Sequence, residues 1–227
     1  ATGQWQALTC PMGLLIPCNG GIVPFTIPII ADEKTLLHVE LRSSERENNF
    51  TPNRVLASCD VEVEAGEHYV PMPLSTEPKN GFVLIALSRN EHLQVGMSDY
   101  YLPALTTLYN YQNPAVSNFG KQVPPVGSGV DSFEFWCPKR RPQSQNIAIR
   151  FEHPIALYGV EQMQTFYTRP YGSSNCWVAE SNDSQPQLII DWDIPMCIEN
   201  ITLFFDTDYD QSLEPIQMGH YDNVSPL

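Results

Sequence analysis

Apolar and polar residues alternate along most of the chain, with the period of two that is typical of a β-strand with one buried face. In the first half, the residues expected to face an interior are Phe25, Ile27, Ile29, Leu37, Val39, Leu41, Val61, Val63, Val70, Met72 and Leu74. Polar neighbours such as His38, Glu40 and Glu62 are expected on the solvent-exposed faces of the strands. The pattern predicts antiparallel sheets with one side toward solvent.

Two details predict where individual strands lie within a sheet. Pro71 and Pro73 interrupt the segment that ends at Leu74, and proline has no N–H for a ladder, so this strand is expected at an edge. Residues 82–87 follow a Lys-Asn-Gly turn signal and are apolar on both faces, which predicts a central strand. Helix is expected only as a turn or two within 155–164.

The second half repeats the strand pattern. Apolar residues occupy alternate positions at Phe133, Phe135, Ile147, Ile149, Phe151, Leu188, Ile190, Trp192, Ile194, Ile201, Leu203 and Phe205. Between them and the first half, residues 110–131 are dense in Pro, Gly, Asn and Ser, which indicates a domain boundary. We therefore expect an all-β protein of two antiparallel β-sandwich, jelly-roll-like units in tandem, residues 1–113 and 114–227.

Charge restricts the partners. The 227 residues include 12 Lys and Arg against 26 Asp and Glu, a formal charge of −14. Each phosphate contact needs a cation, so nucleic acid and anionic membrane surfaces are not expected as partners. No apolar run approaches the roughly 18 residues that span a bilayer, and the chain starts without a leader pattern, as in a mature or excised protein. Asn-x-Ser/Thr patterns at Asn49, Asn182, Asn200 and Asn223 favour an exported protein, periplasmic or extracellular.

The cysteines do not indicate a metal site. They are Cys10, Cys18, Cys59, Cys137, Cys176 and Cys197, and none forms a Cys-x-x-Cys pair, so zinc is not expected. The loop between Cys10 and Cys18 contains two prolines and a glycine and could be closed by a disulfide. Buried free thiols are the alternative.

Motifs that carry catalysis are absent from the sequence, so the chain is not expected to be an enzyme. Asp191 and Asp193 share a strand face, as in a glycosidase dyad, but their alternation with apolar residues favours a solvated face. Asp206, Asp208 and Asp210 place oxygens on alternate positions without the glycine and glutamate of an EF-hand. A structural cation or loop hydrogen bonds are the two interpretations, and no metal is assigned.

An aromatic and polar loop is the best candidate binding site. It contains Arg169, Tyr171, Asn175 and Trp177. Indole and phenol rings stack on the C–H faces of sugars while planar side chains bond the hydroxyls, so the loop is predicted to bind carbohydrate. Core packing of Trp177 is the competing interpretation.

The chain has one basic cluster, Lys139, Arg140 and Arg141, between two prolines. In so acidic a protein, this cluster is a candidate anion site or a contact to an acidic neighbouring domain. The alternative is a solvated loop that contributes little.

Several stretches together resemble a known family. They are LLHVELRSSERENNFTPNRVLASCDVEVEAGEHYV, GFVLIALSRNEHLQVGMS, SFEFWCPKRRPQSQNIAIRFEHPIALYG, TRPYGSSNCWVAES and ITLFFDTDYDQSLEPIQMGH, spread over residues 36–220. In this order they resemble the C-terminal, non-flavin region of large FAD-dependent oxidoreductases, many of them exported bacterial proteins. The resemblance implies that residues 114–227 form a galactose-binding-like jelly roll, and that FAD and catalysis belong to a preceding flavin-binding domain.

Two functions follow as hypotheses. In the first, the chain is a non-catalytic accessory region that packs on the missing flavin domain and binds carbohydrate, with no cofactor of its own. It predicts an exposed apolar patch, since a severed interface exposes what it buried. In the second, the chain is a free-standing extracellular carbohydrate-binding module with a solvent-facing aromatic side chain.

Overall fold

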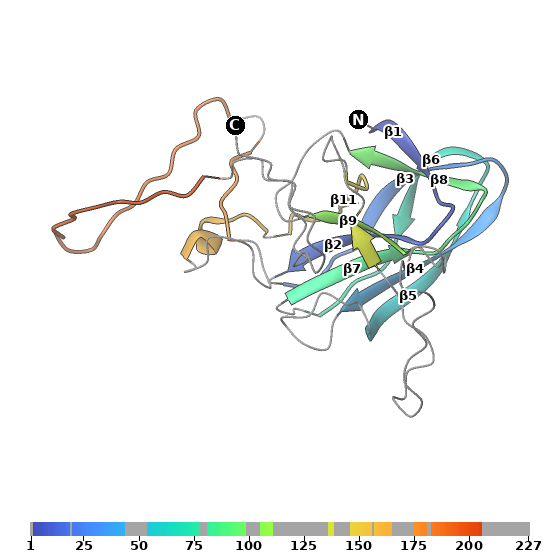
Figure 1. Ribbon diagram of the computed structural model, residues 1–227, viewed down its shortest axis with the longest axis horizontal. Coiled ribbons are helices and arrows are strands. Elements are labelled where there is room, and N and C mark those ends of the chain that lie inside the picture. The colour runs from blue at the N-terminus through green and yellow to red at the C-terminus, as the bar shows by residue number, and fades with distance from the viewer. Residues whose placement is uncertain are drawn as a thin grey trace, which may run out of the picture.

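The computed structural model describes residues 2–18, 20–43, 54–77, 81–98, 105–110, 136–138, 146–155, 157–164, 175–180 and 183–205. Within them the chain forms β-strands and one short 3-10 helix, η1 (Val160–Gln164). The strands make two antiparallel sheets that pack face to face (Figure 1). The protein is therefore an all-β sandwich, as the alternation predicts.

In the described residues, the first sheet contains five strands. Its path runs β1 (Thr2–Ala7), β8 (Leu93–Ser98), β3 (Phe25–Ala31) and β11 (Arg150–Phe151), and β6 (Gly66–Met72) also pairs with β3. Among the described strands, β6 pairs with β3 alone. This confirms that the proline-containing segment is an edge strand.

The second sheet contains six strands within the part of the chain that the structure describes. Their order is β10 (Trp136–Pro138), β9 (Thr106–Asn110), β2 (Met12–Cys18), β7 (Gly81–Leu87), β4 (Thr35–Ser43) and β5 (Arg54–Val63). β7 lies between β2 and β4, which confirms its predicted central position.

The core lies between the two sheets. Alternate residues of β4, such as Val39 and Leu41, are 0% exposed, and they share one cluster with Ile29 of β3 and Val95 of β8. Burial of this kind contributes about 1.5 to 3 kcal/mol for each large aliphatic side chain. The residues of β4 between them point outward and are polar except for Leu36, which is why the sequence alternates there.

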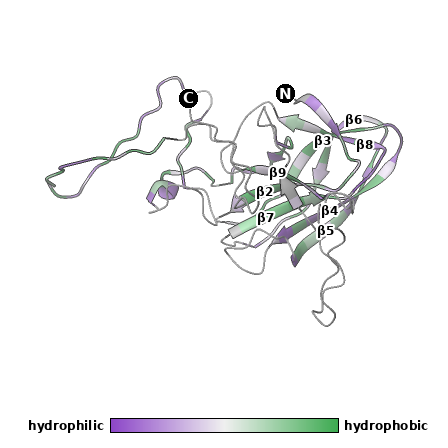
Figure 2. Ribbon diagram, in the orientation of Figure 1, coloured by the Kyte–Doolittle hydropathy of each residue, from purple (hydrophilic) through white to green (hydrophobic). Residues whose placement is uncertain are grey.

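Part of the six-stranded sheet, at β2, β7 and β9, is apolar on its second face as well. A second buried cluster covers this face. It combines Trp136 with the residues of β2, β7 and β9 that alternate with the core positions, and its members are Leu15, Phe82, Leu84, Ala86, Leu108 and Trp136. Hydrophobic residues therefore follow β7 along its length (Figure 2). Gly13 of β2 lies on this side, where an added Cβ would come within 2.7 Å of Leu84 Cδ1.

Segments after the predicted boundary complete both sheets. β10 pairs with β9, and β11 pairs with β3. The division of the chain at 113/114 stays a prediction, but the strands described on its far side pair with strands of its near side.

A buried polar cluster joins the two sheets. Thr107 of β9 donates its hydroxyl to Asn146 Oδ1 at 3.1 Å and accepts the N–H of Ile147 at 3.1 Å. The carbonyl of Asn146 accepts the N–H of Ser98 at 2.7 Å, at the end of β8. Asn146 and Thr107 are both buried, so these bonds tie residues 146–147 to one strand of each sheet.

The strands predicted over residues 188–194 and 201–205 are wrong. Residues 183–205, which we call the arm, contain no strand and extend away from the sandwich (Figure 1). None of the described strands runs beside them to accept their N–H groups. Alternation of apolar and polar residues indicates which side chains would share a face of a strand. A sheet also needs hydrogen bonds to a neighbouring strand, which the alternating pattern does not provide. The helical turn expected within 155–164 is confirmed as η1.

We predict that Thr107→Val lowers the free energy of unfolding by about 1 to 3 kcal/mol, because the buried N–H of Ile147 loses its acceptor. Thr107→Ser keeps the hydroxyl and is the matched control, with a smaller loss. Urea denaturation with unchanged m-values measures both. Equal stability of the valine and serine variants would contradict the role of this hydroxyl.

Candidate functional site

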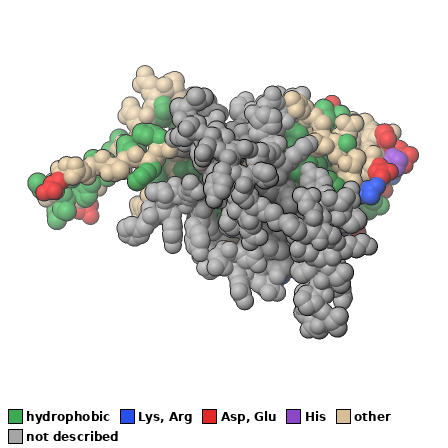
Figure 3. Space-filling model, in the orientation of Figure 1, with side chains coloured by type: hydrophobic (Ala, Val, Ile, Leu, Met, Phe, Trp, Pro, Cys, Tyr) green, Lys and Arg blue, Asp and Glu red, His purple; other side chains and the backbone are tan. Residues whose placement is uncertain are grey.

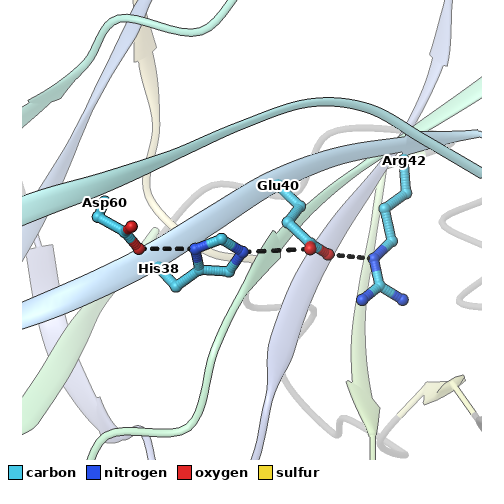
Figure 4. A network of polar contacts seen from close by, with 4 residues as sticks. All are labelled: His38, Glu40, Arg42 and Asp60. Carbon is cyan, nitrogen blue, oxygen red and sulfur yellow. Dashed lines mark hydrogen bonds and ion pairs between the residues drawn. The ribbon is translucent and has the colours of Figure 1, made fainter.

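A row of charged side chains crosses the outer face of β4 and β5. His38 and Asp60 lie directly opposite each other in the strand register. Nδ1 of His38 is 2.7 Å from Asp60 Oδ1, and Nε2 is 3.1 Å from Glu40 Oε1. The other oxygen of Glu40 accepts from Arg42 Nε at 2.5 Å (Figure 4). We call these four residues the charged row.

The geometry favours the protonated form of His38. An ionised carboxylate accepts hydrogen bonds and donates none, so two carboxylates beside the two ring nitrogens stabilise the imidazolium, in which both nitrogens carry protons. The bond to Asp60, followed by the bond to Glu40, raises the pKa of His38 above its usual value. An imidazolium held this way has no free nitrogen and cannot act as a general base.

Glu40 is held ionised from the other side. Partial burial opposes its ionisation, but the bonds from Arg42 and His38 outweigh that effect, so the pKa of Glu40 lies below its usual value. The Arg42 guanidinium also lies 5.8 Å from the centroid of the Trp136 ring, a cation–π distance. Arg42 therefore marks the border between the charged and the apolar parts of this face.

Other charged groups near the sandwich are arranged as surface ion pairs. Lys34 Nζ lies 2.6 Å from Glu62 and 2.7 Å from Glu64, and these bonds raise the pKa of Lys34. His92 contacts Asp32 Oδ1 at 2.9 Å.

The Cys59 thiol is not activated as a nucleophile. Burial, with a smaller effect of Asp60, raises the pKa of Cys59, so this thiol stays protonated and is a poor nucleophile.

The structure describes only part of the predicted carbohydrate loop. Asn175 and Trp177 are half-buried, and the chain there is joined to the rest by a bond from Val178 N to the carbonyl of Tyr158 at 3.2 Å. Arg169 and Tyr171 lie outside the described residues. Trp177 is thus accessible on part of its surface, while the grouping of the four residues stays a prediction.

The remaining predicted sites have different positions. Asp191 and Asp193 are exposed on the arm, in the solvated setting that the alternation favours. Lys139, Arg140 and Arg141, and likewise Asp206, Asp208 and Asp210, lie outside the described residues. The predicted Cys10–Cys18 disulfide is wrong. The extended strand β2 lies between the two residues, and at about 3.3 Å per residue it holds their Cα atoms farther apart than the roughly 7 Å that a disulfide spans.

No three or more His, Cys, Asp and Glu side chains among the described residues are grouped to hold a metal ion. No helix among the same residues is long and apolar enough to cross a membrane.

Comparison with known proteins returned no match to a family model, a curated protein or a solved structure. The fold places the chain in the class of β-sandwich proteins with two antiparallel sheets.

The sequence did not single out the charged row. Its signal is present as polar residues of opposite sign at 38, 40 and 42, but the partner at Asp60 follows from the register of β4 on β5. That register depends on the turn and on tertiary packing, which one strand's sequence does not specify.

The charged row makes stability depend on pH. Because the pKa of His38 is raised by folding, its contribution is complete below about pH 6.5, the unfolded value, and is lost as pH rises through the folded value. We predict that Asp60→Asn lowers the pKa of His38 in an NMR titration. With His38 42% exposed, the cost to stability is below about 1 kcal/mol. An unchanged His38 titration in the variant would show that Asp60 is not the main cause.

Proposed function

We propose that the chain is a non-catalytic C-terminal accessory region of an FAD-dependent oxidoreductase, which packs on a flavin-binding domain and binds carbohydrate. The observation that carries this proposal is the exposed apolar surface of the arm. The order of the five stretches between residues 36 and 220 supports the family.

The arm exposes more apolar surface than scattered single residues would. Its exposed large hydrophobic residues are Leu188, Ile189, Ile190, Trp192, Ile194, Met196, Ile198, Ile201, Leu203, Phe204 and Phe205. Their side chains follow one another along the surface (Figure 3). A contiguous exposed apolar surface of this kind is typical of an interaction site, and it is what the accessory hypothesis predicts.

The finer architecture belongs to the same proposal. Residues 1–113 would form one sandwich and residues 114–227 a galactose-binding-like jelly roll in tandem. In that division, β10 and β11 belong by sequence to the second unit while they complete the sheets of the first. They would then be the contact between the units.

The division of roles also follows from the resemblance. FAD and catalysis belong to the flavin domain, and this chain holds no cofactor and performs no reaction. Lys139, Arg140 and Arg141 are proposed to contact an acidic group of the neighbouring domain or an anion. The protein is proposed to be exported, as the Asn-x-Ser/Thr patterns favour.

The coding sequence upstream of Ala1 tests the accessory role. We expect a Gly-x-Gly-x-x-Gly fingerprint after a predicted strand, since this motif holds the FAD pyrophosphate at a helix N-terminus. The longer protein should purify with the absorbance of bound flavin. A coding sequence that begins at or near Ala1 would contradict the proposal.

The second candidate is a free-standing extracellular carbohydrate-binding module. The partial exposure of Trp177, with Asn175 two residues before it, favours sugar binding in either function. A fully buried indole would have no face for a sugar ring, and this one keeps part of its surface open.

We predict that Trp177→Ala weakens binding of simple sugars about tenfold, equivalent to about 1.4 kcal/mol, in titration calorimetry. Trp192→Ala on the arm is the matched control and is expected to leave sugar affinity unchanged. If galactose, glucose and N-acetylglucosamine all fail to bind the unmodified chain, carbohydrate binding is excluded for these sugars. Equal losses in the two variants would move the site away from Trp177.

A further inference from the structure

The arm has the side-chain pattern of a strand with two different faces. Every second residue from Leu188 to Ile198 is apolar. These side chains remain in solvent, from 36% exposed at Leu188 to 65% at Ile194. We call them the apolar stripe, and its members are Leu188, Ile190, Trp192, Ile194, Met196 and Ile198. In a strand, such a stripe would line one face.

The charged residues of the arm lie outside the apolar stripe. Asp191 and Asp193 alternate with its members, Glu199 follows Ile198, and Asp183 lies at the start of the arm. Ile189, on the same side as Asp191, is apolar and exposed. Residues 183–205 contain no Lys, Arg or His, so the arm bears four carboxylates and no compensating cation of its own. Pro195 and Cys197 interrupt the charged side near its middle.

The backbone of residues 184–205 is not paired with the rest of the described chain. None of the backbone–backbone hydrogen bonds recorded for the described residues involves this segment. The segment bends at Asp193–Ile194, so it is not a single straight strand in this state. Pairing with a sheet edge would straighten it, give its N–H and C=O groups partners and cover one face of its side chains.

We infer that the arm is a docking segment that adds as a strand to a protein partner whose contact surface is an apolar strip flanked by Lys or Arg. This inference rests on the proposed function, in which the chain packs against another domain, and it adds which residues and charges form the contact. The apolar stripe fills the strip, and the carboxylates meet the cations at its border. The occupant is therefore a basic-rimmed protein surface.

Charge argues against two other occupants. A second copy of the chain would bring another net charge of −14 and a second set of carboxylates to the contact. An anionic lipid surface would repel the carboxylates of the arm in the same way. Both occupants remain distinct outcomes of the test.

The experiment uses the full chain and a synthetic ten-residue peptide of alternating Leu and Lys, capped at both ends. Such a peptide presents an apolar face and a cationic face to the arm. The intrinsic fluorescence of Trp192, which is 48% exposed, reports binding by a shift to shorter wavelength. Trp192→Phe identifies the part of the signal that comes from the arm.

We predict saturable binding of the Leu-Lys peptide that weakens at least tenfold between about 50 mM and about 500 mM salt. The double variant Ile190→Ser, Ile194→Ser should lose binding at least tenfold, and Asp191→Asn, Asp193→Asn should reduce the salt dependence. The matched control is Leu36→Ser, an apolar residue 58% exposed on β4, which should bind as the unmodified chain does.

Four results would overturn the inference. They are equal binding of a Leu-Glu peptide, equal loss in the Leu36→Ser control, a dimer that the Ile190→Ser, Ile194→Ser variant dissolves, and tighter binding to anionic vesicles that contain phosphatidylserine than to the Leu-Lys peptide. The accessory role is tested separately by the sequence upstream of Ala1. If the peptide binds but the upstream sequence contains no flavin fingerprint, the docking role of the arm is supported and the accessory role in a flavoprotein is contradicted.

Discussion

Burial of β7 on both faces is the constraint on which the rest of the structure depends. Ile85 faces the sandwich interior and Leu84 faces the cluster that contains Trp136, and each is 1% exposed. β7 itself is apolar on both faces, so its register with β4 is set by β4, where a slip of one residue would turn polar residues such as Glu40 toward the interior. That register turns Val39 and Leu41 of β4 inward, and the charged row lies outside as a result.

Several strands of the sandwich could be predicted because apolar and polar residues alternate along them. β4 alternates between buried and more exposed positions, β5 alternates between partly buried and exposed ones, and Pro71 identifies β6 as an edge strand. β2 was missed, since Leu14, Leu15 and Ile16 are apolar on both faces and give no period of two. The arm shows the opposite failure, because its alternation is clear while no neighbouring strand is described.

The candidate sites differ in how much of each could be predicted from the sequence. Trp177 and Asn175 attract notice by residue type, and their partial burial agrees with a surface role. The His38–Asp60 pair joins residues 22 positions apart, and it exists only through the register of two strands. Sequence indicates which side chains carry chemistry, whereas pairing between distant strands determines which of them meet.

Pro195 limits what the arm can build. A strand of alternating apolar residues with free edges is the kind of segment that stacks copy upon copy into fibrils. Proline offers no N–H to a further strand, and like charges at Asp191, Asp193 and Glu199 would face each other in a stack. A sheet that accepts the arm therefore ends with it, so association stops after one added strand instead of growing without limit.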